Sequence, residues 1–446
     1  MDQTFMKERK ILPLVLSMSL PMVISMAVNS LYNIVDSYFV AKLSEKAMTA
    51  LALVYPVQNL MNAIAIGFGI GINANVSYYL GAGNKEKANN SATQGIVLSF
   101  VHGVILTIGC IAIMPVFLGA FSSDQEVVGL ACIYSNRAFM FSVISALAIS
   151  FEKIFQSTGN MKVSMFSMMC GFITNIILDP LMIFGIGIFP AMGMAGAAYA
   201  TGAGQSITLL IYLLFYFFKP IPVKIKRKYL YFDREVFLRL YSVGIPATLN
   251  MALPSLLVSS LNGILAGFSE KYVLVLGVYY KLQTFIYLTA NGIIQGIRPL
   301  VGYNYGAGEY GRVKKIYKAT LKLTMAVMLA GTILSWGIPD ILIGLFTENT
   351  ETIGVGVEAL HRISLGFVVS AVSVSCSGAL EGLGKGLPSL YISLARYVVI
   401  MIPAAFLLSR GAGANGVWLA FCLTEFLTAA FAYWIFKKQF KISQIS

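Results

Sequence analysis

Two aspartates lie inside long apolar stretches, where a charged side chain is costly. Asp36 follows Asn29, Tyr32 and Asn33 at the spacing i, i+3, i+4 and i+7, which places all four on one face of a helix. A carboxylate at the centre of a bilayer costs on the order of 3 kcal/mol on insertion scales, so an embedded one is a candidate functional residue. We therefore expect this polar stripe to face protein or water.

The second aspartate, Asp179, lies one turn after Asn175 and directly before Pro180. Proline lacks an amide N–H and clashes with the preceding turn, so it bends the helix and frees the carbonyl of Ile176. Thr201 lies in the small-residue run 196–204, where close helix approach could bring its hydroxyl to the same point. Oxygen groups of these kinds suit sodium as well as a proton. The predicted cation-binding and coupling residues are Asp36, Asn175, Asp179 and Thr201.

A further polar stripe is uncharged. Gln283, Tyr287, Asn291 and Gln295 recur every four residues, on one helix face. Neutral amides beside aromatic rings can line a cavity for large organic molecules, and they can equally form hydrogen bonds between helices. The residues predicted to line a substrate cavity are Tyr32, Asn33, Tyr55, Gln58, Asn62, Asn250, Gln283, Tyr287 and Asn291.

The sequence contains no recognisable catalytic constellation. His102 and His361 do not lie at metal-ligand spacing, and the five cysteines are scattered without paired spacing. A hydrolase would need a nucleophile with a base, or a cluster of metal ligands. We expect no enzyme activity, no cofactor, no disulfide and no metal beyond a possible sodium ion at the predicted cation site.

The elements that must position these residues are membrane-spanning helices. The 446 residues are 57% hydrophobic and 11% charged, with a mean hydropathy of +0.77, which is far more apolar than a soluble protein. Runs of roughly 20 or more apolar residues predict an all-α integral membrane protein with twelve spans. The predicted spans are 11–40, 48–80, 91–117, 127–157, 162–188, 193–218, 236–266, 272–303, 315–338, 352–382, 387–409 and 413–436.

One pattern occurs twice, 225 residues apart. Pro21 recurs as Pro246, Gln58 as Gln283, and the tripeptide at 81–83 recurs at 306–308. A repeat of this kind predicts two homologous six-helix bundles. The predicted organisation is an N-terminal bundle over residues 1–218, a cytoplasmic linker over 219–235 and a C-terminal bundle over 236–446.

The repeat also helps to decide between a functional role for the two aspartates and a structural role in contact with water. Asp36 could lie at an outer mouth and Asp179 could cap an interfacial helix end, both in contact with water. The second half, however, has Leu261 at the position of Asp36 and no aspartate near Pro403. The fold alone therefore does not require the acids, which favours a functional role in the first half.

The net charge of +13 does not indicate nucleic-acid binding, because the basic residues are sorted to one side of the membrane. They gather at 7–10, 85–87, 219–239, 312–318 and 437–441. The opposite loops hold at most Lys42, Lys46, Lys271 and Arg410, alongside Asp124, Glu126, Glu348 and Glu351. By the positive-inside rule both termini and the linker are cytoplasmic.

Taken together, these features resemble the multidrug and toxic compound extrusion (MATE) family, in particular its MepA-like bacterial branch. The features that support this resemblance are the twelve spans in two equal halves, Asp36, the run from Asn175 to Pro180, and the run from Gly302 to Gly308. The resemblance implies two six-helix bundles around a central cavity, in a monomer of the bacterial inner membrane that exports cationic or amphiphilic drugs in exchange for protons or sodium ions. It also implies that Asp36, Asn175, Asp179 and Thr201 match the family's cation site.

The sequence departs from some family members in its second half. Their acidic residues in spans 7 and 10 have no clear counterpart: span 7 offers Asn250, and Glu381 is expected near the cytoplasmic end of span 10. We therefore do not expect ion coupling through the C-terminal half.

The physics of such an exchange can be stated without the family. Burial and a neighbouring acid both favour the protonated form of a carboxyl group, so a buried pair can hold a proton near neutral pH. A cationic drug and a proton would then compete for one negative centre. The rival hypothesis is a lipid-linked oligosaccharide flippase, whose diphosphate substrate requires fixed positive charge, and Arg137, Arg362 and Arg396 are the residues that could supply it.

Overall fold

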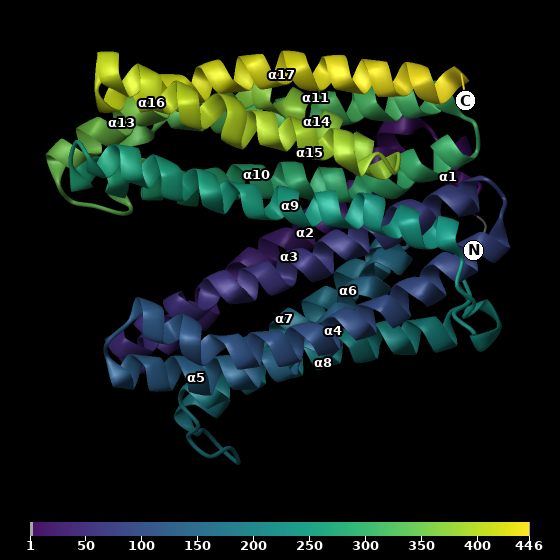
Figure 1. Cartoon of the computed structure of the whole chain (residues 1–446), viewed down its shortest axis with the longest axis horizontal. Coiled ribbons are helices and arrows are strands. Elements are labelled where there is room, and N and C mark those ends of the chain that lie inside the picture. The colour runs from purple at the N-terminus through teal and green to yellow at the C-terminus, as the bar shows by residue number, and fades with distance from the viewer. Residues whose placement is uncertain (1–2, 446) are drawn as a thin grey trace. The chain divides into compact units, whose positions relative to one another are not determined.

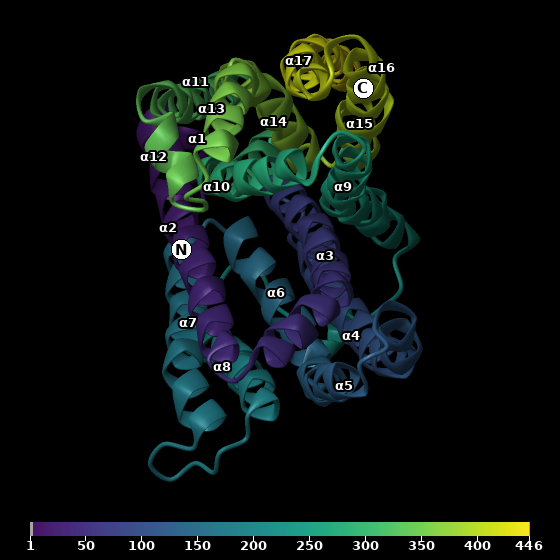
Figure 2. The same cartoon turned by 90° about the vertical axis from the view of Figure 1, so that its left-hand side faces the viewer.

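The computed structural model describes residues 3–445, with side chains through residue 440, and the regular secondary structure in this part of the chain is helical throughout (Figures 1 and 2). The first half comprises α1 (Phe5–Glu8), α2 (Ile11–Ala41), α3 (Glu45–Gly81), α4 (Lys85–Phe121), α5 (Gln125–Met140), α6 (Ser142–Ser157), α7 (Met161–Phe184) and α8 (Met194–Phe218). A single 3-10 turn, Arg227–Tyr229, lies in the linker.

The second half follows the same order with more interruptions. It comprises α9 (Arg234–Ala266), α10 (Glu270–Gly306), α11 (Tyr310–Gly337), α12 (Pro339–Gly344), α13 (Thr350–Ser364), α14 (Phe367–Gly382), α15 (Gly386–Leu394), a π-helical segment (Ala395–Ile400), α16 (Met401–Ala412) and α17 (Ala414–Ile445).

Ten spans in the described part of the chain are long and apolar enough to cross a membrane, and twelve if each of two bent helix pairs counts as one span. The bent pairs are α5 with α6, at 47°, and α13 with α14, at 53°. They correspond to the fourth and tenth predicted spans, which the sequence presented as continuous. The twelve predicted spans therefore have counterparts in the structure, with these two broken near their middle.

The two breaks share a local feature. Beside the first, the Thr107 hydroxyl on α4 donates to the carbonyl of Phe139 at 3.1 Å. Beside the second, the Thr332 hydroxyl on α11 donates to the carbonyl of Ser364 at 3.1 Å. The two threonines are 225 residues apart, and so are Phe139 and Ser364, so both pairs follow the period of the internal repeat. A carbonyl released from its own helix is thus satisfied by the neighbouring helix, which allows the bend.

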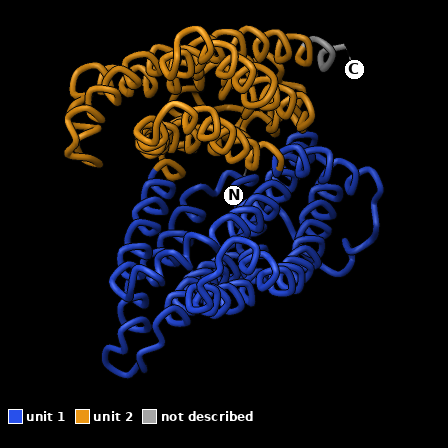
Figure 3. Tube along the Cα trace, turned by 60° about the vertical axis from the view of Figure 1, so that its left-hand side comes forward, with its two compact units in different colours: residues 1–4, 24–248 blue, residues 5–23, 249–446 orange. Residues whose placement is uncertain are grey.

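The chain forms two compact units (Figure 3). Unit 1 contains residues 1–4 and 24–248, and unit 2 contains residues 5–23 and 249–446. The first part of α2 thus belongs to unit 2, and the first part of α9 to unit 1. The bundle limits predicted from the sequence, 1–218 and 236–446 with a linker between them, stay a prediction.

Glycines that recur at the period of the repeat allow close packing of the first parts of α2 and α9. In unit 2, a Cβ at Gly292 or Gly296 on α10 would lie 2.7 or 2.6 Å from the Cα atoms of Val23 and Ser19 on α2. In unit 1, a Cβ at the repeat-related Gly67 on α3 would lie 2.2 Å from the hydroxyl of Thr248 on α9. Real Cβ atoms do not approach so closely, so glycine is required at these crossings.

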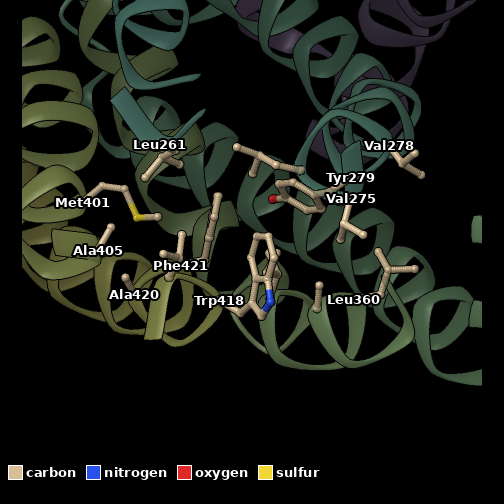
Figure 4. Close-up of a cluster of buried hydrophobic side chains, with 14 of the residues drawn as sticks. Leu261, Val275, Val278, Tyr279, Leu360, Met401, Ala405, Trp418, Ala420 and Phe421 are labelled. Atoms are coloured by element: carbon tan, nitrogen blue, oxygen red, sulfur yellow. The ribbon is translucent and has the colours of Figure 1, made fainter. Parts of the chain in front are cut away.

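The position in unit 2 that corresponds to Asp36 is apolar. Trp418, Tyr279 and Phe421 pack there with aliphatic residues, and Leu261 is fully buried among them (Figure 4). Leu261 occupies the repeat position of Asp36. The two units therefore share a backbone plan but differ in the chemistry of their centres.

Candidate functional site

The two embedded aspartates meet inside unit 1. Asp179 on α7 has no exposed surface and Asp36 on α2 is 9% exposed. Their carboxyl groups are hydrogen-bonding neighbours, while the other oxygen of Asp36, Oδ1, has no partner among the described residues. A hydrogen bond between two carboxyl groups requires that one of them carry a proton. The pair can therefore hold one proton, and it retains an acceptor oxygen for a further ligand.

Asn175 and Thr201 adjoin this pair. The Asn175 amide is best satisfied when its nitrogen donates to Asp179 Oδ2 at 3.0 Å and its oxygen accepts from the Thr201 backbone N–H at 3.1 Å. The opposite amide orientation gives longer contacts, 3.4 Å to Asp179 Oδ1 and 3.3 Å to Thr201 Oγ1. The structure thus brings together all four residues of the predicted cation site, whereas their function stays a prediction.

This meeting depends on the close approach of α7 and α8. A Cβ on Gly171 would lie 1.9 Å from the Thr208 hydroxyl, and one on Gly204 would lie 2.7 Å from the Gly171 carbonyl. The small-residue run in α8 therefore allows backbone contact with α7, as its composition indicated. Asn175 lies one turn beyond Gly171 on the same helix, so the backbone contact fixes its distance from Thr201.

Aromatic hydroxyls close the site on its other sides. Tyr32, one turn before Asp36 on α2, forms a hydrogen bond with Thr201 and stacks on Phe172 at 5.3 Å between ring centroids. Tyr134 on α5 is buried beside both aspartates and forms a hydrogen bond with Gln58 on α3. Sequence analysis missed Tyr134, because a tyrosine in a broken span gives no periodic signal of its own.

The remaining cavity residues of unit 1 are not part of this cluster. Tyr55 is 63% exposed, Asn33 is exposed and donates to the carbonyl of Asn29 at 2.7 Å, and Asn62 is half-buried. Their side chains do not contribute to the carboxylate pair in the described structure. Whether they line a substrate cavity stays a prediction.

The neutral stripe on α10 is largely engaged in hydrogen bonds within unit 2. The Gln283 amide donates to the Tyr279 hydroxyl at 2.7 Å, and the Tyr287 hydroxyl donates to Ser370 Oγ at 2.8 Å. Asn291 is exposed. Of the two alternatives for this stripe, hydrogen bonds between helices apply to Tyr287, whereas Asn291 remains available to a ligand.

Unit 2 also contains a buried ion pair. Arg396 in the π-helical segment donates to Glu425 Oε1 on α17 through Nε at 3.0 Å and Nη2 at 2.5 Å, and Nη2 also donates to the Tyr287 hydroxyl at 3.0 Å. Glu425 is 8% exposed. Sequence analysis overlooked it, although the rule that singled out the two aspartates applies to any carboxylate inside an apolar span.

A second ion pair lies near the ends of α10 and α14. Arg298 and Glu381 pair at 2.7 Å, and Glu381 is buried. That Glu381 lies near the cytoplasmic end of its span stays a prediction. Asn250, a predicted cavity residue, donates to Glu381 Oε1 and to Ser389 Oγ, both at 3.2 Å. The chain lowers the cost of burying Arg298 by pairing it, which its position beside a proline did not reveal.

The three arginines of the flippase hypothesis do not form a positive cluster. Arg396 is neutralised by Glu425 and Arg362 pairs with Glu358, while Arg137 donates to the carbonyl of Ile133 at 3.0 Å. A diphosphate would need several free cations at one point. The described side chains also provide no group of three or more histidine, cysteine or acidic residues that could hold a metal ion.

Comparison with known families decides the identity of the fold. The MatE family model matches residues 21–181 and 246–407. The two matches begin 225 residues apart, the period of the internal repeat, and together cover well over half of the sequence. The chain belongs to the MatE family. MatE proteins are transporters, and the resemblance expected from the sequence is confirmed at this level.

Relatives of this MatE chain include proteins called multidrug export protein MepA. Those of Staphylococcus saprophyticus and of Staphylococcus aureus are each 24% identical to it over 412 residues, covering 92% of this chain and 90% of the relative.

Solved structures confirm the predicted all-α membrane fold. A multidrug resistance MATE family transporter in an outward-facing conformation superposes with a TM-score of 0.93 at 24% identity, over 100% of this chain and 99% of the other. A MATE structure in complex with MaL6 gives 0.93 at 23% identity over 100% of both chains. At these identities the likeness establishes the fold.

Proposed function

We propose that this chain is a monomeric secondary active exporter of cationic or amphiphilic organic compounds, driven by protons that move in the opposite direction and without a cofactor. Membership in the MatE family and the similarity to proteins called multidrug export protein MepA support export of small molecules. The single observation that carries the ion assignment is the buried pair of Asp36 and Asp179. Its neighbouring carboxyl groups can share a proton, and the fold itself does not require them, because unit 2 has Leu261 at the position of Asp36.

Competition at this pair would couple the two fluxes. A proton neutralises the pair in one state, and a cationic compound neutralises it in the other. Each occupied form must favour a different conformation for transport to follow. α2 suits such a role, since it carries Asp36 in unit 1 while its first part belongs to unit 2. Occupancy of the site can therefore act along one continuous helix.

The energy available depends on the charge of the substrate. One pH unit supplies about 1.4 kcal/mol per proton, and 100 mV supplies roughly 2.3 kcal/mol per unit charge. Exchange of one proton for a neutral compound uses both contributions. Exchange of one proton for a monovalent cation moves no net charge, so only the pH gradient drives it.

The proposed location is the bacterial inner membrane, with both termini and the linker cytoplasmic. The sorting of lysine and arginine supports this orientation, because the side opposite the basic linker carries few of them. Two of those few are paired: Lys46 contacts Asp124 at 3.2 Å and also Glu126, and the repeat-related Lys271 contacts Glu351.

The test is coupled efflux from proteoliposomes that contain the Asp36→Asn variant. This substitution keeps the shape of the side chain and removes its charge, so we expect pH-driven efflux to be abolished while the protein still folds and inserts. Glu45→Gln is the matched control, because Glu45 is an exposed carboxylate at the start of α3, and its variant is expected to transport normally. Efflux by Asp36→Asn within twofold of wild type at equal expression would reject the proposal.

A further inference from the structure

A basic groove runs along the surface of unit 2, between the start of α2 and the first half of α11. It encloses about 540 Å³ and is lined by Ile11, Leu12, Lys315, Lys318, Ala319, Lys322 and Leu323. Lys315, Lys318 and Lys322 recur at i, i+3 and i+7, so they form one line on α11. All three are exposed, as is Leu12. The groove thus combines three cations with an apolar floor.

These three lysines differ from the cations around them. Arg312 donates to the carbonyls of Met6 and Arg9, Lys7 pairs with Glu309, and Lys314 lies over the Phe440 ring. In contrast, the ion pairs found among the described side chains include none of the three groove lysines. Arg312 and Lys7 therefore hold the N-terminal segment in place and Lys314 contacts α17, while the groove lysines remain free to bind an anion.

The depth of the lysines indicates which anion. From Leu323 to Gly337, the uncharged part of α11 has 15 residues and is about 22 Å long, whereas the hydrocarbon core is about 30 Å thick. Lys322 therefore lies at or within the edge of the hydrocarbon region. Lys315 lies about 10 Å closer to the helix start, at the level of the lipid head groups. Long lysine side chains extend toward the lipid head groups, so all three ammonium groups can meet the phosphate of one anionic lipid, whose acyl chains also suit the apolar part of the groove.

The internal repeat provides a comparison. The residues of α4 that correspond to Lys315 and Lys318 are Asn90 and Thr93, and both are buried. Asn90 donates to the carbonyls of Tyr229 and Tyr231 in the linker, both at 2.9 Å. At these two positions unit 1 is covered by the chain itself through neutral hydrogen bonds, while Val97, the counterpart of Lys322, is exposed and uncharged. In unit 2 the same face is basic and open, which is consistent with an occupant that is charged and not part of the chain.

We propose that this groove binds one anionic phospholipid from the leaflet on the basic side of the membrane. Its phosphate contacts Lys315, Lys318 and Lys322, and its acyl chains lie along Leu12 and Leu323. Each lysine near an anionic lipid surface strengthens binding about fivefold, which gives on the order of a hundredfold for three. The lipid would also join the start of α2 to α11, next to the place where Arg312 joins the segment before α2 to α11.

The test is native mass spectrometry of the delipidated full chain in detergent, titrated with phosphatidylglycerol or with phosphatidylcholine of the same acyl chains. A variant with Lys315→Gln, Lys318→Gln and Lys322→Gln removes the groove charges. The control replaces Lys219, Lys437 and Lys438 with glutamine, which removes three exposed charges elsewhere. We expect the groove variant to lose one phosphatidylglycerol adduct, with about hundredfold weaker binding, and the control to bind within twofold of wild type.

If the triple variant does not fold, Lys322→Gln alone is expected to weaken the same adduct about fivefold. Raising the salt concentration should weaken binding to wild type and leave the residual binding of the triple variant unchanged. Equal loss in the groove and control variants would overturn the proposal, as would equal binding of the two lipids. Binding of inorganic phosphate with no greater affinity for the lipid would likewise overturn it, because the groove would then recognise a free anion.

Discussion

Replacing Gly204 with alanine is expected to disrupt the aspartate site without touching any of its side-chain oxygens. Gly204 lies on α8 where that helix meets α7, and a Cβ there would lie 2.7 Å from the carbonyl oxygen of Gly171 and 3.2 Å from Cβ of Asn175. The first obstacle is backbone, which cannot rotate away. The two helices must therefore separate.

The size of the effect follows from these distances. Ordinary contact begins near 3.4 Å, so α7 and α8 must move apart by roughly 0.7 Å to accept the methyl group. The contact between Asn175 and the Thr201 backbone N–H would then lengthen from 3.1 Å to nearly 4 Å, beyond hydrogen-bonding distance. Overpacking of this kind costs about 1–3 kcal/mol of stability. A misplacement approaching 1 Å in a functional site lowers rates by up to about a hundredfold, and we expect at least a tenfold loss of efflux.

The assay combines thermal unfolding in detergent with pH-driven ethidium efflux from proteoliposomes. Gly109→Ala on α4 is the control, because nothing lies within 4 Å of the Cβ it would add. Alanine is favoured over glycine in a helix by about 0.5–1 kcal/mol, so the control should be at least as stable as wild type and equally active. Wild-type efflux and wild-type unfolding by Gly204→Ala would refute the argument that helix contact positions the site.

Two further predictions concern unit 2. Alanine at Asn291 should change which compounds are exported more than it changes ion coupling. Alanine at Gln283 should have a smaller effect on selectivity, because the Gln283 amide is bound to a tyrosine hydroxyl. Export is measured across a panel of drugs, and an equal loss for all of them would mean that both residues are structural. Arg396→Met should lower the free energy of unfolding, measured by chemical denaturation, by about 3–5 kcal/mol, since it leaves Glu425 buried and unpaired. Adding Glu425→Leu should restore much of that loss. No recovery in the double variant would contradict this account.

Much of the fold could be predicted because it follows from composition and repetition. Apolar length located the spans, and the 225-residue period located the two halves. The bends within the fourth and tenth spans could not be foreseen, because the hydrogen bonds beside them come from threonines on neighbouring helices. Nor did the sequence indicate that α2 and α9 each contribute to both compact units.

The candidate site was partly predictable for a similar reason. Asp36 and Asp179 are conspicuous in apolar surroundings, and the small residues around Thr201 indicated that α8 approaches another helix closely. Tyr134 joined them only in three dimensions. Glu425 could have been found by the same argument that singled out the aspartates, whereas its pairing with Arg396, 29 residues earlier, depends on the packing of α17 against the π-helical segment.

The central claim is that the pair formed by Asp36 and Asp179 couples export to protons. The most direct measurement is ethidium or norfloxacin efflux from proteoliposomes under a pH gradient alone and under a sodium gradient alone, for wild type, Asp179→Asn and Thr201→Ala. A proton needs the carboxyl pair, whereas sodium needs several oxygens at once. The account predicts efflux driven by the pH gradient, loss of that dependence in Asp179→Asn, and its retention in Thr201→Ala. Efflux driven by external sodium at constant pH, and destroyed by Thr201→Ala, would contradict it.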